Sequence, residues 1–139
     1  MFCFHCRQMA KQSHILITGQ PGIGKTTLIK KLAQKLPEPL SGFYTEEIRD
    51  SNGRRIGFDV VSLERANDRK PLARDNCNQR GPKVGKYTVL LSEFESIAIP
   101  CLDKETSCKH IIIIDEIGKN CSISCYILIP DVIDDRPKG

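Results

Sequence analysis

The residues with the clearest chemical capacity lie in one glycine-rich stretch near the N-terminus. Gly19 is followed by four residues and then by Gly24-Lys25-Thr26, which fits the pattern G-x-x-x-x-G-K-[ST] without a mismatch. Glycines in such a stretch let successive backbone N–H groups turn toward phosphate oxygens. Lys25 supplies a positive charge for the β- and γ-phosphates, and the Thr26 hydroxyl is placed to ligate Mg²⁺. The stretch therefore predicts a loop that binds the phosphates of a nucleotide. The predicted nucleotide-binding residues are Gly19, Gln20, Pro21, Gly22, Ile23, Gly24, Lys25, Thr26 and Thr27.

The segments on either side of this loop have the character that it requires. The preceding run, His14-Ile15-Leu16-Ile17-Thr18, is apolar and β-branched, as in a strand buried in a parallel sheet. We expect a helix to open at Thr26, with its positive end toward the phosphates, and to fade at Leu36-Pro37. Its apolar face comprises Leu28, Ile29, Leu32, Ala33 and Leu36. An ordinary glycine-rich turn is the alternative, and the strand and helix around the loop disfavour it.

A second candidate for chemistry follows a run of four isoleucines. Ile111–Ile114 has no polar face, so we expect a strand that is buried on both sides. Asp115 then lies at the C-terminal edge of the sheet, where open α/β sheets bind ligands. There Asp115 would complete the Mg²⁺ shell, and Glu116 would polarise the attacking water. Two solvated carboxylates before a turn at Gly118 are the alternative. The predicted catalytic residues are Lys25 and Glu116, and the predicted metal ligands are Thr26 and Asp115.

The sequence between residues 42 and 63 predicts a β-hairpin. Asn52-Gly53 is a strong turn signal between two segments that are rich in aromatic and β-branched residues. Residues 64–85 are polar with few apolar anchors, so we expect a solvated surface loop there. The alternative is a mobile flap that brings Arg74 or Lys86 near the phosphates.

A further strand and helix are expected before the isoleucine run. The strand occupies residues 86–91, and Ser92 with Glu95 forms a capping box that opens the helix. Pro100 ends or kinks this helix. Its apolar face comprises Phe94, Ile97 and Ala98.

Composition narrows the class of protein and its partners. The chain has 139 residues, of which 40% are apolar and 27% charged, which fits one soluble globular domain. Its net charge of +4 is too small, and its basic residues too scattered, to indicate nucleic acid. No run approaches the ~20 apolar residues of a membrane span, and no secretory signal is visible, so we expect a cytoplasmic monomer without a membrane partner. The seven cysteines favour scattered reduced thiols over a disulfide framework. They also favour them over a zinc site at Cys3, Cys6, Cys121 and Cys125.

The motifs of this chain recur in the order found in a known family. They occupy residues 19–27, 42–48, 54–61, 71–74, 84–87 and 113–119. Over residues 14–119 the chain resembles the small P-loop nucleoside-triphosphatase family. The resemblance implies a RecA-like α/β sheet. It also implies slow, Mg²⁺-dependent hydrolysis of ATP, GTP and other nucleoside triphosphates with little base preference.

The resemblance ends after Lys119. Residues 121, 123, 125, 127 and 129 are apolar, which is strand periodicity where the family has a helix. Such a strand would pair with an open sheet edge or aggregate. Without the family's later elements, we expect Ile111–Ile114 to be poorly covered, with reduced stability and turnover.

The predicted organisation is an extension at residues 1–12, a single P-loop domain at 13–129 and a disordered tail at 130–139. Both ends resemble those of an alternative or truncated product. The predicted fold is a RecA-like α/β domain, with a mostly parallel sheet, helices on both faces and an added β-hairpin, that is incomplete at its C-terminus.

The predicted function is Mg²⁺-dependent hydrolysis of a nucleoside triphosphate to the diphosphate and phosphate. Arg55 or Arg74 would stabilise the charge of the transition state, and the sequence does not choose between them. Two alternatives stay open, a nucleoside or nucleotide kinase and a truncated, catalytically impaired nucleotide-binding form.

Overall fold

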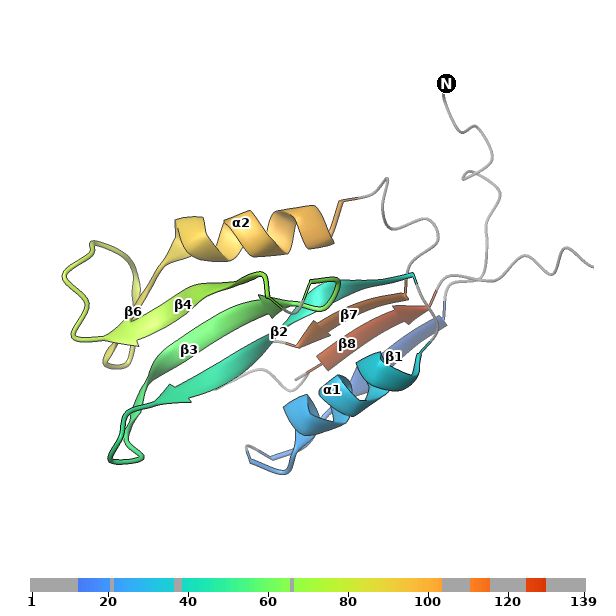
Figure 1. Cartoon of the computed structure of the whole chain (residues 1–139), viewed down its shortest axis with the longest axis horizontal. Helices are drawn as coiled ribbons and strands as arrows, with labels where there is room; N and C mark the ends of the chain where they lie inside the picture. Colours follow the sequence, from blue (N-terminus) through green and yellow to red (C-terminus); the bar gives the residue numbers. More distant parts are fainter. Residues whose placement is uncertain are drawn as a thin grey trace, which may run out of the picture.

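The computed structural model describes residues 13–20, 22–36, 39–65, 67–103, 111–115 and 125–129. They form one mixed sheet of eight strands and two helices (Figure 1). The helices are α1 (Lys25–Lys35) and α2 (Leu91–Cys101). In their order across the sheet, the strands are β1 (Ser13–Ile17), β8 (Cys125–Ile129), β7 (Ile111–Asp115), β2 (Leu40–Arg49), β3 (Arg55–Ser62), β4 (Arg69–Asp75), β6 (Tyr87–Val89) and β5 (Lys83–Val84). The predicted extension and tail lie outside the described residues.

The sheet is mostly antiparallel. β2 and β7 run parallel, whereas the other described strand pairs are antiparallel. Short connections join β2 to β3 and β3 to β4, and strands joined in this way run in opposite directions. β8 adds two more antiparallel pairings, because it runs opposite to both β1 and β7. The α/β class is thus confirmed, and the prediction of a mostly parallel sheet is wrong.

The predicted hairpin is confirmed as the pair β2 and β3. Asp50 organises the turn, because its carboxylate accepts hydrogen bonds from the backbone N–H groups of Asn52 and Arg54, both at 2.9 Å. Gly53 takes a φ of +76°, which favours glycine at this turn position. The Asn-Gly signal in the sequence therefore marks the observed turn.

The segment predicted as a surface loop instead contributes two strands. Residues Arg69–Asp75 form β4 between β3 and β6, and Lys83–Val84 forms the short strand β5 at the sheet edge. Leu72 and Ala73 are the anchors of β4, because both are buried in the core beneath α2. Two apolar residues are enough here because strand pairing on both sides satisfies the backbone of the remaining polar residues.

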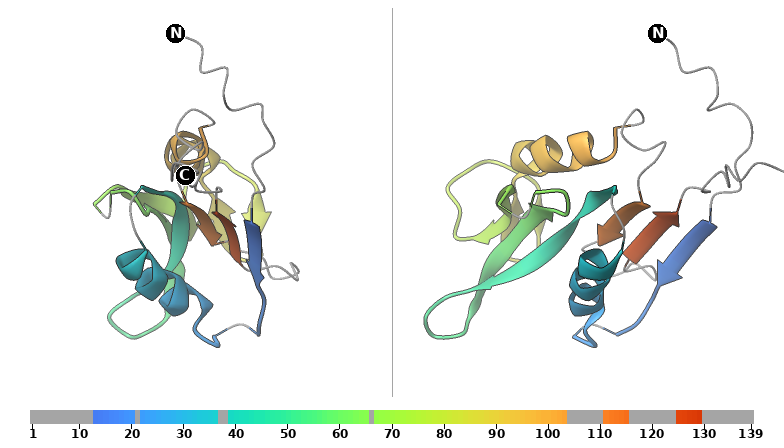
Figure 2. Two further views of the ribbon diagram at one scale, coloured as in Figure 1. Left: turned by 90° about the vertical axis from the view of Figure 1, so that its right-hand side faces the viewer. Right: turned by 45° about the vertical axis from the view of Figure 1, so that its right-hand side comes forward.

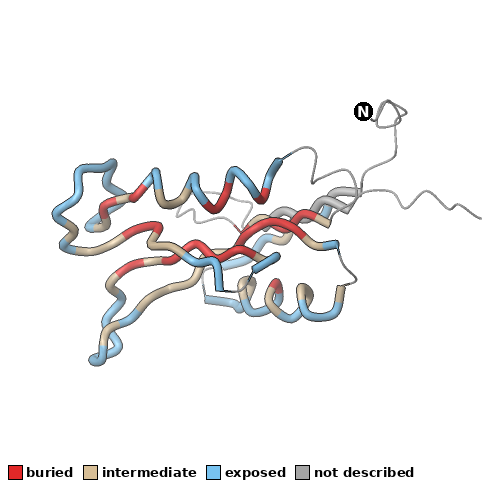
Figure 3. The backbone as a smooth tube through the Cα atoms, turned by 45° about the horizontal axis from the view of Figure 1, so that its top comes forward, coloured by how far each residue is buried: buried red, intermediate tan, exposed pale blue. Residues whose placement is uncertain are grey.

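The two helices cover opposite faces of the sheet, and each lies over its own hydrophobic core (Figure 2). Phe43 and Tyr44 are neighbours on β2, so their side chains point to opposite faces. Phe43 lies in the core beneath α2, where its ring meets Phe94 edge-on at a centroid distance of 5.4 Å. Tyr44 packs on the other face against the core of Ile29 and Ile113, both 0% exposed. Figure 3 shows the buried residues gathered along the middle of the sheet and on the sheet side of α2.

Helix α2 begins without the predicted capping box. Its first residue is Leu91, the N-cap is Leu90, and no side chain forms a cap hydrogen bond. Leu90 is buried and its N–H donates to the carbonyl of Leu72 at 2.8 Å, so the end of β6 fixes the helix start and Ser92 falls inside the helix. The apolar face of Phe94, Ile97 and Ala98 is confirmed. Pro100 lies in the last turn of this helix. Neither described helix has the length and apolar character to cross a membrane.

Strand β8 lies between β1 and β7. The predicted strand is confirmed for residues 125–129, while 121–124 lie outside the described residues. β1 is consequently an edge strand with Ile15 44% exposed, so its prediction as a strand buried in a parallel sheet is wrong. The expected poor cover of the isoleucine run is also wrong at Ile112 and Ile113, which are 6% and 0% exposed. Ile113 shares a core with Ile29 of α1.

Candidate functional site

The glycine-rich loop connects β1 to α1. Gly22 and Gly24 have φ values of +81° and +100°, in the left-handed region that side-chain-bearing residues rarely adopt. α1 begins at Lys25, one residue before the predicted start at Thr26. Gly24 therefore turns the chain directly from the loop into the helix. Pro21, one of the predicted nucleotide-binding residues, lies outside the described residues.

The Lys25 side chain folds back over its own loop. Its Nζ donates hydrogen bonds to the carbonyl oxygens of Gly19 and Gln20, at 2.7 and 2.8 Å. These two contacts hold the ammonium group at the loop. An anion that enters the loop would meet this charge at the place where the loop's backbone is most tightly turned.

The first turn of α1 leaves its backbone donors available. Within the described chain no side chain caps this end, and the first turn contains no acidic residue. The first N–H groups of a helix have no intrahelical acceptor, and the helix dipole adds partial positive charge there. The loop and the helix end together form a surface that attracts a negatively charged group.

A hydroxyl–carboxylate pair joins this helix to the end of β7. Thr26 Oγ1 donates to Asp115 Oδ2 at 2.6 Å, although the two residues are far apart in the chain. Asp115 is only 3% exposed, and this burial raises its pKa above the ordinary value. Thr26, the Lys25 charge and the backbone N–H of Thr45 each favour the ionised form and oppose that rise.

These two oxygen ligands suit a magnesium ion. Mg²⁺ is bound in nucleotide sites by one or two protein oxygens, with phosphates and water in the remaining positions. Thr26 and Asp115 offer such a pair beside the loop. Among the described residues there is no cluster of three or more histidine, cysteine, aspartate or glutamate side chains that could hold a metal by themselves. Thr26 and Asp115 could hold a metal ion whose remaining ligands are phosphate oxygens and water.

A second polar contact joins α1 to the sheet one turn further along. Lys30 pairs with Glu46 of β2, and its Nζ lies 4.9 Å from the ring centre of Tyr44. Because Thr26 and Lys30 are four residues apart, they share one face of the helix. Glu46 and Lys30 were not predicted as site residues. Two sequence spacings could have pointed to them. Lys30 follows Thr26 by four residues on the same helix face. Glu46 follows Tyr44 by two residues on the same sheet face.

The basic residues proposed from the sequence for the transition state lie in different places. Arg55 pairs with Glu47 at 2.7 Å and its guanidinium stacks on Phe58, which belongs to the core beneath α2. Arg74 pairs with Asp59 of β3. Lys86, the alternative flap residue, instead pairs with Asp75 at 2.9 Å. Glu116, the predicted catalytic carboxylate, lies outside the described residues.

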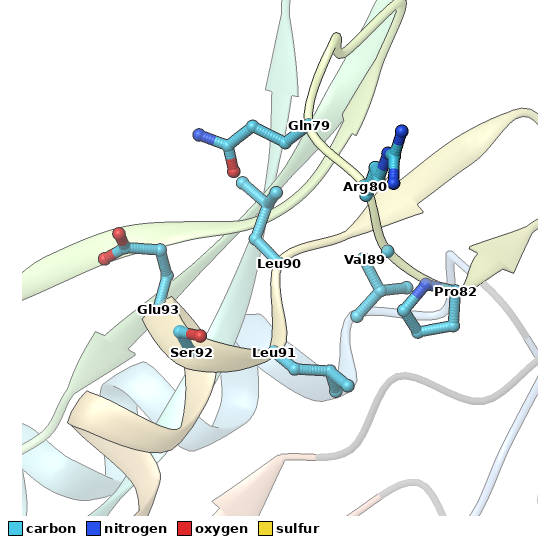
Figure 4. A pocket seen from close by; sticks show the side chains of 9 residues that line it. Gln79, Arg80, Pro82, Val89, Leu90, Leu91, Ser92 and Glu93 are labelled. Carbon is cyan, nitrogen blue, oxygen red and sulfur yellow. The ribbon is translucent and has the colours of Figure 1, made fainter.

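A pocket of about 280 Å³ lies elsewhere, between the start of α2 and the segment before β5 (Figure 4). Gln79, Arg80 and Pro82 approach from one side, and Leu90 through Glu93 from the other. No predicted site residue lines it. The lining residues therefore give no link between this pocket and the glycine-rich loop.

In this α/β protein, the glycine-rich loop and the uncapped start of α1 thus lie beside the Thr26–Asp115 pair. The profile of the family described as NTPase matches residues 14–121, and the chain belongs to this family.

Relatives of the chain carry the same designation. It is 45% identical over 118 residues to the cancer-related nucleoside-triphosphatase of Homo sapiens, covering 76% of this chain and 60% of that protein. It is 49% identical over 105 residues to the nucleoside-triphosphatase THEP1 of Thermotoga sp. (strain RQ2), covering 76% and 58%. It is 41% identical over 107 residues to the THEP1 of Methanocaldococcus jannaschii, covering 75% and 61%. The chain thus spans about three fifths of the length of these curated relatives. No solved structure matches it.

Proposed function

We propose that this chain hydrolyses nucleoside triphosphates to the diphosphate and inorganic phosphate, with Mg²⁺ as cofactor. One observation carries the proposal, the hydrogen bond of 2.6 Å between Thr26 at the loop end of α1 and buried Asp115 at the end of β7. This contact brings the two expected metal ligands together beside a loop whose backbone and lysine attract anions. Family membership supports the same reaction class.

Different residues would bind the phosphates, the metal ion and the attacking water. The loop amides and the start of α1 would hold the β- and γ-phosphates, with Lys25 exchanging its two carbonyl partners for phosphate oxygens. Thr26 and Asp115 would hold Mg²⁺, which supplies charge neutralisation between the β- and γ-phosphates when bound. Glu116, the residue after Asp115, would orient the attacking water.

Low base selectivity is part of the proposal, because the groups assigned to the nucleotide, the loop amides, Lys25 and Thr26, are of the kinds that bind phosphates and Mg²⁺ rather than a base. For the kinase alternative, residues 64–85 could supply an acceptor lid. Residues 69–75 of that segment form an internal sheet strand, which leaves a shorter stretch for such a lid. The carboxylate of Glu116 directly after Asp115 supports water as the acceptor.

The test is steady-state release of phosphate from ATP, GTP, CTP and UTP, each with Mg²⁺ and with EDTA. We expect turnover with all four and none in EDTA. Glu116→Gln should retain nucleotide binding and lose at least about 100-fold in kcat, since a water-orienting group acts in the transition state. Lys25→Ala should lose nucleotide binding.

Three results would count against the proposal. Unchanged turnover in Glu116→Gln removes that residue from the mechanism. Full nucleotide binding by Lys25→Ala removes the loop from the site. Diphosphate formation that needs an added nucleoside, without release of phosphate, indicates a kinase instead.

A further inference from the structure

The sheet face beside α1 carries an alternating row of charges. Lys30 of α1 pairs with one carboxylate oxygen of Glu46, and Arg69 Nη2 pairs with the other at 2.8 Å. Arg69 also contacts Asp59 through Nε and Nη2, at 3.0 and 2.9 Å, and Arg74 pairs with the second oxygen of Asp59. The row has three cations and two carboxylates, so it keeps one positive charge in excess.

This row begins next to the proposed metal site. Glu46 directly follows Thr45, whose N–H contacts Asp115, and Lys30 lies one helical turn beyond Thr26. From strand spacing and rise, Glu46 and Asp115 have Cα atoms about 8 Å apart. Both side chains face α1, because both are bonded to it. The row of charges therefore starts one helical turn from Thr26 and one residue from Thr45, which contacts Asp115.

Of the arginines in this region, Arg69 alone combines position with an available donor. Arg55 lies on the other face of the sheet, because it contacts Glu47 and Phe58. Arg74 is held by the carbonyl oxygens of Phe58 and Ala73, at 2.6 and 2.9 Å, in addition to its carboxylate partner. For Arg69, no acceptor among the described residues bonds its Nη1 atom, and the side chain is 42% exposed.

We propose that Arg69 is the catalytic cation that contacts the γ-phosphate during hydrolysis, with Glu46 and Asp59 as positioning residues. This assignment rests on the proposed hydrolytic function. The water oxygen bonds to the γ-phosphorus as the bond to the β–γ bridging oxygen breaks. The bond's electron pair stays on the departing diphosphate, and the water proton passes to phosphate or solvent. Arg69 remains protonated throughout and neutralises the charge that builds on the γ-phosphate oxygens.

The experiment compares Arg69→Ala and Arg69→Lys with Lys70→Ala in the full chain. Lys70 is the matched control, because it is the next residue and its partner is Glu93 of α2 at 3.2 Å. Phosphate release gives kcat. Separate titrations measure the affinities for a fluorescent Mg-ATP analogue and for Mg-ADP with aluminium fluoride, which mimics the transferring phosphoryl group.

We expect Arg69→Ala to lower kcat by at least about 100-fold, as loss of one preorganised donor does in other enzymes. Its affinity for the ATP analogue should stay within about threefold, while affinity for the aluminium fluoride complex falls with kcat. Guanidinium ion at millimolar concentration should partly restore turnover. Lys70→Ala should match wild type, and Arg69→Lys should fold and fall between the two, because a lysine keeps the charge without the planar fork.

Turnover of Arg69→Ala within threefold of wild type would reject the assignment. So would a loss confined to binding of the ATP analogue, with kcat unchanged. If only the alanine variant fails to fold, the same criteria apply to Arg69→Lys, for which wild-type kcat and wild-type affinity for the aluminium fluoride complex reject it. If the wild-type chain binds nucleotide but releases no phosphate, hydrolysis itself is rejected and this role is rejected with it.

Discussion

Replacing Thr26 by valine removes the hydroxyl that joins α1 to Asp115 while keeping the shape of the side chain. The lost bond is a short one, 2.6 Å, to a carboxylate that is only 3% exposed. A hydrogen bond to a charged group contributes about 1.5–3 kcal/mol. In a chain of this size 1 kcal/mol shifts Tm by about 3–4 °C, so we expect Thr26→Val to melt about 5–12 °C below wild type. Thr26→Ser, which keeps the hydroxyl, should lose much less.

Thermal melting with and without Mg-ATP measures both consequences of this change. A ligand at one hundred times its Kd adds about 2.7 kcal/mol to the stability of the folded state, and that gain should appear in wild type and vanish in Thr26→Val. Thr27→Val is the stability control, because Thr27 is the adjacent hydroxyl residue and is exposed. A Thr26→Val melt within 1 °C of wild type would show that the bond to Asp115 contributes nothing to the fold, and the reasoning on which the proposed metal site rests would be refuted.

Three further predictions concern the elements that support the site. Gly42→Ala should lower the free energy of unfolding in urea by roughly 3 kcal/mol or more, because φ at Gly42 is +112° and a Cβ would lie 1.9 Å from the carbonyl oxygen of Ile113. A decrease below about 1 kcal/mol would contradict this prediction. Ile29→Ala should cost about 2–5 kcal/mol since Ile29 is 0% exposed, whereas Leu28→Ala, at 44% exposure, should cost under about 1; equal losses would contradict the assigned helix face. The pairing with Lys30 lowers the pKa of Glu46 below its ordinary value of 4.5. The ionised Glu46 side chain therefore stabilises the folded state fully above pH 4.5, and this stabilisation is lost as the pH falls through the lowered pKa. The stability advantage of wild type over Glu46→Gln should therefore narrow from pH 6 to pH 3, and a constant difference would exclude Glu46 ionisation as its source.

The parts of the fold that were predictable have local signals. The glycine-rich loop, the Asn52-Gly53 turn and the run Ile111–Ile114 each need only a few consecutive residues to be recognised. The strand β4 has no such signal, because Pro71 interrupts a polar stretch in which only Leu72 and Ala73 are buried. Its stability comes from β3 and β6 on either side, and single-residue patterns do not encode pairing with distant strands.

The same distinction explains the errors at α2 and at the site. Ser92 and Glu95 satisfy the spacing of a capping box. The hydrogen bond from the N–H of buried Leu90 to β4 instead places the N-cap at Leu90, so the helix begins before Ser92. At the site, the loop and Asp115 could be predicted as separate motifs. The ion pairs of Glu46 and Arg69 could not, because they join α1, β2 and β4, and the last of these was expected to be a loop.

The place of β8 in the sheet sets an order for assembly of the molecule. Among the described strands β1 pairs with β8 alone, and β8 is reached more than a hundred residues later in the chain. Closing so long a loop lowers the entropy of the chain before the strand pairing can stabilise it. Contacts between such distant residues therefore slow folding. During synthesis from the N-terminus the hairpins of β2, β3 and β4 are available long before β8. The strand that leads into the glycine-rich loop is therefore synthesised first, whereas β8, its partner among the described strands, is synthesised last.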